Sequence, residues 1–203
     1  MARLLALLLL AACHPPPPVS MGDVNHAPSE KYENVVGLWT RQGHVVHDFD
    51  ESITVNATLH GPEMRAAYAE KWVAMYQLNH ADAERMRAQL FAEVGDVWEV
   101  HVESSAHFSD EDNFKQEKKV WRLALLTDRG REVGPSSVQL DRTRREVQTA
   151  FYPYANDFTR GWKVQFPRRA SDGQPLIDDA ATRIILRIAG PHGTTELVWA
   201  LKR

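Results

Sequence analysis

Apolar and polar residues alternate along several short segments, and this two-residue period constrains the fold of the chain more than any other feature. The segment SITVNATLH, residues 52–60, places Ile53, Val55, Ala57 and Leu59 on one face, as a half-buried strand requires. Further strands are predicted at 98–102, 121–125, 137–140, 146–152, 161–166, 182–189 and 195–201. The last two are joined by GPHGT, a glycine-bounded turn typical of hairpins.

A helical period interrupts this pattern over residues 62–94. Gly61 ends the strand, and Pro62 suits the first turn of a helix because its missing N–H would be unpaired there. Two apolar stripes follow at helical spacing, on either side of the helix cap Asn79: Met64, Tyr68, Trp72 and Met75, then Ala83, Met86, Leu90 and Val94. We predict a helical hairpin whose stripes pack on a sheet.

Many short antiparallel strands with turns between them favour a β-sandwich that carries the helical hairpin as an insertion. The pattern leaves two arrangements open, an immunoglobulin-like strand order and a barrel-like α+β fold. No second linker and no internal repeat interrupts the segment 32–203, so we predict a single domain there.

The amino terminus has a different character. Arg3 is followed by nine apolar residues, Leu4 to Ala12, which are too few for a membrane span of roughly 20 residues but suit a secretory signal peptide. Leu10-Ala11-Ala12-Cys13 resembles the lipobox of bacterial lipoproteins, and Cys13 is the only cysteine in the chain. The resemblance implies cleavage before Cys13, a diacylglyceryl group on its sulfur and an acylated amino terminus, because a thiolate is the nucleophile that can be alkylated. Two or more acyl chains give a stable membrane anchor.

The lipobox also suggests a location. His14, rather than an aspartate, follows Cys13, which by the sorting rule of enteric lipoproteins favours the outer membrane over the inner membrane. Residues 13–31 hold five prolines, so we expect a semi-rigid tether between the membrane lipid and the domain.

Charge and motifs narrow the function. The chain has 24 Lys and Arg against 27 Asp and Glu, which argues against a nucleic-acid partner because such proteins are strongly basic. The chain has no HExxH, no G-x-S-x-G and no phosphate-binding glycine loop. We therefore expect a protein without a cofactor that binds or scaffolds an envelope protein or other envelope component, rather than an enzyme.

The alternative function rests on HVVHDFDE, residues 44–51. His44, His47, Asp48 and Asp50 are side chains that transition metals bind, so this segment could serve a metal-binding or hydrolytic envelope protein. Successive strand residues point to opposite faces, however, and histidines three residues apart converge only in a turn. We expect a solvated loop here. His101, a single histidine on the polar face of a strand, adds little to this case.

The densest aromatic stretch, FYPYANDFTRGWKVQF at 151–166, supplies the candidate binding patch. Its alternation assigns Phe151, Trp162 and Phe166 to the core. Pro153 and Asn156-Asp157 favour a loop, where exposed rings and a cation resemble binding surfaces. The predicted patch consists of Tyr152, Tyr154, Phe158 and Arg160.

Overall fold

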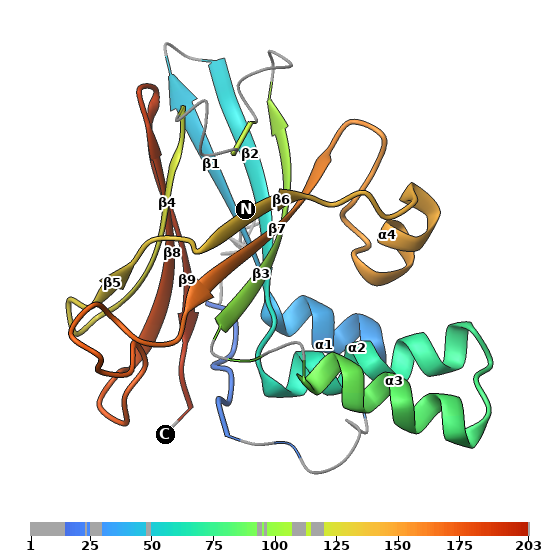
Figure 1. Ribbon diagram of the computed structural model, residues 1–203. Helices are drawn as coiled ribbons and strands as arrows, with labels where there is room; N and C mark the ends of the chain where they lie inside the picture. Colours follow the sequence, from blue (N-terminus) through green and yellow to red (C-terminus); the bar gives the residue numbers. More distant parts are fainter. Residues whose placement is uncertain are drawn as a thin grey trace, which may run out of the picture.

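Two antiparallel β-sheets form the body of the protein (Figure 1). The computed structural model describes residues 15–22, 24, 30–47, 50–92, 95, 97–106, 113–114 and 120–202. The first sheet has the order β1-β2-β3-β7-β6 and comprises β1 (Thr40–His47), β2 (Asp50–Leu59), β3 (Val97–Ala106), β7 (Arg160–Pro167) and β6 (Ser137–Leu140). The second has the order β5-β4-β8-β9 and comprises β5 (Glu132–Val133), β4 (Arg122–Thr127), β8 (Arg183–Gly190) and β9 (Gly193–Ala200).

The apolar faces of both sheets meet in one core, which confirms the predicted mainly β, sandwich-like fold. The fully buried side chains include Ile53, Val55, Val100, Val102, Trp162, Val164, Leu125, Ile184, Leu186 and Trp199. The sheets do not close into a barrel. β1, β2 and β3 are consecutive neighbours in one sheet, whereas an immunoglobulin domain places its third strand in the other sheet.

The sheets approach each other most closely where β1 contacts β9. A Cβ atom on Gly43 would lie 2.6 Å from Thr195 Oγ1, so any larger residue there would force the Thr195 side chain to shift. The turn before β9 is the predicted hairpin, with Gly190 paired to Gly193 across Pro191-His192.

The helical hairpin is also confirmed. It consists of α2 (Pro62–Met75) and α3 (His80–Ala92), which lie beside α1 (Tyr32–Trp39) below the first sheet in Figure 1. Asn79 caps α3, because its Oδ1 accepts a hydrogen bond from Asp82 N at 3.0 Å. Met64 is fully buried, but Trp72 is only half-buried and stacks on Tyr76. Val94 lies outside the described residues.

The structure differs from the sequence prediction at residues 146–152. They were expected to form a strand, but Arg145–Phe151 form a short helix, α4. Gln148 and Phe151, three residues apart, are the side chains that α4 buries. A seven-residue helix is too short for its period to be distinguished from strand alternation, and here the packing of Phe151 against Tyr68 decides.

Two segments that were expected to be a loop and a tether contribute to the sheets. Residues 40–47 form an edge strand, so His44 lies on β1 and not in a loop. Val19, within the expected tether, is fully buried and pairs with Leu201, since its N–H donates to Ala200 O at 2.8 Å. The chain therefore contacts the domain ahead of the expected start at Tyr32. Among the described residues, none of the helices has the length and apolarity needed to cross a membrane.

Candidate functional site

Part of the polar face of the first sheet, around His101 and Glu103, is buried rather than exposed to solvent. Glu99, His101 and Glu103 alternate with core residues along β3 and therefore point away from the sandwich core. His101 and Glu103 are nevertheless 1% and 0% exposed. A buried histidine and carboxylate are uncommon and need hydrogen-bonding or charged partners.

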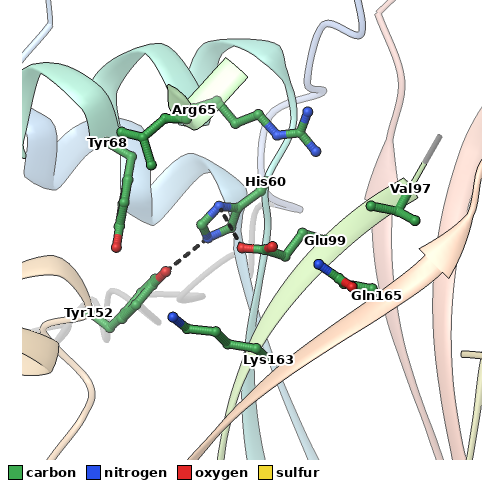
Figure 2. Close-up of a pocket in the computed structure, with 9 residues that line it drawn as sticks. His60, Arg65, Tyr68, Val97, Glu99, Tyr152, Lys163 and Gln165 are labelled. Atoms are coloured by element: carbon green, nitrogen blue, oxygen red, sulfur yellow. Dashed lines mark hydrogen bonds and ion pairs between the residues drawn. The ribbon is translucent and has the colours of Figure 1, made fainter. Parts of the chain in front are cut away.

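A pocket of about 220 Å³ lies at this face, between α2 and strands β3 and β7 (Figure 2). Its polar lining residues are His60, Arg65, Glu99, Tyr152, Lys163 and Gln165. Tyr68 from α2 forms an aromatic wall beside Tyr152, with 6.4 Å between ring centroids. The pocket thus combines residues from the end of β2, from α2, from the segment after α4, and from two neighbouring strands.

His60 lies in the middle of the side chains that line the pocket, just after β2 (Figure 2). Its Nε2 lies 2.9 Å from the Tyr152 hydroxyl, and its Nδ1 lies 3.6 Å from Glu99 Oε1 (Figure 2). The next residue must be Gly61, because a Cβ there would lie 2.1 Å from the Trp39 ring. This close packing turns the chain sharply from β2 into α2 and fixes the position of His60.

Burial determines the protonation state of the pocket. It lowers the pKa of His60 to about 4, while Glu99 opposes the shift and Arg65, His101 and Lys163 add to it. Burial also raises the pKa of Tyr152 well above its ordinary value of 10. At neutral pH the imidazole is uncharged, so one ring nitrogen carries a proton and the other accepts; a proton on Nδ1, which faces Glu99, leaves Nε2 to accept a hydrogen bond from the Tyr152 hydroxyl.

A second buried group of polar side chains, the acidic network, lies directly behind Tyr152. His101 stacks on the Tyr152 ring with 3.6 Å between centroids and 2° between planes. His101 Nε2 lies 3.0 Å from Glu103 Oε1, and Nδ1 lies 3.7 Å from Asp141 Oδ2. Glu103 Oε2 accepts hydrogen bonds from Thr159 Oγ1 and, at 3.3 Å, from Arg145 Nη1.

The two carboxylates of this network remain ionised. Burial raises the pKa of Glu103, but hydrogen bonds from His101 and Thr159 outweigh it, so the pKa is lowered overall. Burial acts on Asp141 in the same way, and Thr143, Lys163 and His101 lower its pKa overall. The network connects β3, β6, β7 and α4, and it thereby holds Tyr152 in the pocket wall.

Neither His60 nor Tyr152 has a pKa that suits a general base or a nucleophile near neutral pH. A general base that works near neutrality needs a pKa close to 7, which the His60 imidazole lacks. A tyrosine with a raised pKa is a weak nucleophile. The lining instead offers hydrogen-bond donors on Arg65, Lys163 and Gln165.

The structure disperses the residues of the predicted aromatic patch. Tyr152 is buried, at 5% exposure, and lines the pocket instead of a surface. Tyr154 is half-buried, shares a hydrogen bond with Thr58 Oγ1 and lines a separate, shallow hollow beside α1. Phe158 is 88% exposed, and Arg160 starts β7 in a half-buried position.

The alternative metal segment is spread along a β-hairpin. His44 is exposed on β1, and His47 of β1 pairs with Asp50 of β2. Asp48 lies outside the described residues, as do Cys13 and the rest of the lipobox. Within the described part of the chain, no three His, Cys, Asp or Glu side chains are grouped to hold a metal ion.

Sequence reasoning missed His60, Glu99, His101 and Glu103. The available signal was EVHVE at 99–103, which places two carboxylates and an imidazole on one strand face. The alternation alone does not show whether this face is solvated or buried, because only the helices packed over it reveal its burial. Comparison of the chain with protein-family models, with curated proteins and with solved structures gave no match.

Proposed function

We propose that the protein is a lipid-anchored lipoprotein of the bacterial cell envelope that binds a small polar ligand in the pocket at His60, without catalysing a reaction. The observation that carries the binding function is the pocket itself. Its volume of about 220 Å³ lies below the 300–1,000 Å³ typical of drug-sized ligands, so it suits a small molecule or the end of a larger one.

The rigidity of the pocket supports this proposal. Glu103 and Asp141 position His101, which stacks on Tyr152, and Tyr152 in turn hydrogen-bonds His60. Preformed sites lose less conformational entropy on binding and bind more tightly for their size. We expect the ligand to be a component of the envelope, on which the lipidated protein would be retained.

Filling the pocket tests the binding function. Small polar compounds are screened for a rise in melting temperature of the purified full chain, and the compounds that bind are repeated on Gln165→Trp, which places a large ring in the pocket. The matched control is Gln174→Trp in an exposed loop. The proposal requires that Gln165→Trp abolishes the shift and that Gln174→Trp retains it. Compounds that act equally on both variants would disprove it.

The anchor is tested separately at Cys13. We expect Cys13→Ser to move the protein from the detergent phase to the aqueous phase, and mass spectrometry of the wild type to find a lipidated terminus at residue 13. An unmodified amino terminus at another residue would contradict the lipoprotein proposal. Fractionation of the wild type into the inner membrane would contradict only the outer-membrane location.

A further inference from the structure

Positive charge outweighs negative charge around the pocket. Arg65 and Lys163 line it, and Glu99 is its only acidic lining residue. Arg168 lies nearby, since its Nε donates to Val97 O at 3.2 Å and its guanidinium lies 4.2 Å from the centre of the Trp98 ring. The imidazole of His60 is neutral at pH 7 and adds no charge. The described side chains thus leave the pocket with a surplus of cations.

Arg65 forms no direct ion pair with any residue that the structure describes, and Glu99 acts on it only at longer range. The side chain is half-buried, and its Nη2 atom is buried without a hydrogen-bond partner. Burial and the nearby Arg168 lower the pKa of Arg65 to about 10, while Glu99 opposes this, so Arg65 is still charged at neutral pH. A buried, charged donor without a partner destabilises a fold unless a ligand satisfies it.

Lys163 is the second cation and is only loosely paired. Its Nζ lies 3.8 Å from Asp141 Oδ1, and 49% of the side chain is exposed. Asp141 has other partners, because Thr143 N donates to its Oδ1 at 2.9 Å. Lys163 can therefore turn into the pocket without leaving Asp141 unpaired.

The size of the pocket limits the ligand. A volume of about 220 Å³ corresponds to about seven molecules of liquid water. An arginine fork pairs with carboxylate or phosphate through two parallel hydrogen bonds, and a lysine adds a point charge. The volume has room for one such anionic group with a small remainder, and both Arg65 and Lys163 line it.

We propose that the pocket binds a small anion, and that Arg65 and Lys163 hold its carboxylate or phosphate group. This inference rests on the proposed binding function and specifies its ligand class. It also accounts for the buried, unpartnered Nη2 of Arg65, since functional sites commonly reduce stability.

The test is a titration of the ¹⁵N-labelled full chain, at constant ionic strength, with acetate, inorganic phosphate or the neutral analogue acetamide. We expect saturable shifts of the Arg65, Val97 and Lys163 amide signals with acetate or phosphate. Acetamide should bind at least about tenfold more weakly than these anions. A response to acetate alone identifies a carboxylate ligand, and a response to phosphate alone identifies a phosphate ligand.

Two variants are decisive. Arg65→Gln and Lys163→Gln should each weaken anion binding about tenfold or more, while Arg85→Gln, at an 80% exposed site on α3, should not change it. Arg65→Gln should also melt at the same or a higher temperature, because it removes the buried Nη2 donor that has no partner. Equal binding of acetate and acetamide, or unchanged anion binding by Arg65→Gln, would overturn the inference.

The two proposals fail differently. If neutral compounds bind and Gln165→Trp abolishes their binding, but anions do not bind, the binding function stands and the anion inference is wrong. If Gln165→Trp affects the binding of no compound, charged or neutral, both proposals are wrong.

Discussion

The Nε2 atom of His60 lies 2.9 Å from the hydroxyl oxygen of Tyr152, and this buried hydrogen bond joins the end of β2 to the end of α4. Tyr152 also stacks face to face on His101, which contacts Glu103 and Asp141. Tyr152 thus links the pocket to the acidic network behind it. We therefore expect substitutions in the pocket or in the network to change the free energy of unfolding through this side chain.

Tyr152→Phe isolates the hydrogen bond. The ring and its stacking on His101 remain, but the buried His60 Nε2 loses its donor, which typically costs about 1 to 3 kcal/mol. Urea denaturation measures the free energy of unfolding. The control, Tyr76→Phe at a 47% exposed site on the same face as Trp72, should change it by less than about 0.5 kcal/mol. Equal effects of both variants would show that the His60–Tyr152 bond does not stabilise the fold.

The pH dependence of stability follows from His60. Its pKa is about 4 in the folded state and 6.5 unfolded, so between these values the unfolded chain binds more protons and stability rises with pH. The contribution of His60 to the free energy of unfolding is complete above pH 6.5 and is lost as the pH falls towards 4. The total loss is of the order of 3 kcal/mol. Denaturation curves at pH 7 and pH 4.5 measure it.

His60→Gln should reduce this acid sensitivity while lowering stability at pH 7. The exposed His80→Gln on α3 controls for the loss of one imidazole from the chain. An unchanged slope between pH 7 and pH 4.5 in His60→Gln would show that the buried imidazole does not govern this pH range.

Glu103→Gln tests the acidic network. The amide keeps the shape of the side chain but removes a buried charge that Arg145 and His101 contact, and breaking a buried ion pair costs about 3 to 5 kcal/mol. Because the pKa of Glu103 is lowered from its ordinary value of 4.5, its contribution is present above that pH and is lost as the pH falls through the folded pKa. The difference between wild type and variant should therefore narrow in acid. Arg122→Gln, in an exposed pair with Glu132, should cost less than about 1 kcal/mol. A Glu103→Gln cost no larger than that would contradict a stabilising network.

The last prediction compares two aromatic residues in the loop after α4, Tyr154 and Phe158. Phe158→Ala should leave stability within about 0.5 kcal/mol of wild type, since the ring is 88% exposed. Tyr154→Ala should cost about 2 to 3 kcal/mol, because it removes a half-buried ring and its hydrogen bond to Thr58. Tyr154→Phe separates the hydroxyl from the ring, and thermal and urea unfolding measure all three. Similar, small effects of both alanine variants would place Tyr154 on the surface with Phe158.

The sequence alone determined the parts of the fold whose periodicity is long and regular. Ile184, Leu186 and Ile188 are buried as their alternation predicted, and Asn79 caps α3 as its position predicted. Such patterns are local, because a strand or helix of sufficient length carries its own period and its own end signals.

Only the tertiary structure decided the candidate site. Whether the polar face of β3 is solvated or buried depends on α2 and α4, which pack over it from distant parts of the chain. The short segment 145–151 became a helix because Phe151 packs against Tyr32 and Tyr68. The alternation of Glu99, His101 and Glu103 shows that they share one face of β3. Their partners come from distant parts of the chain, which no local sequence pattern identifies: Tyr152, Asp141 and Arg145.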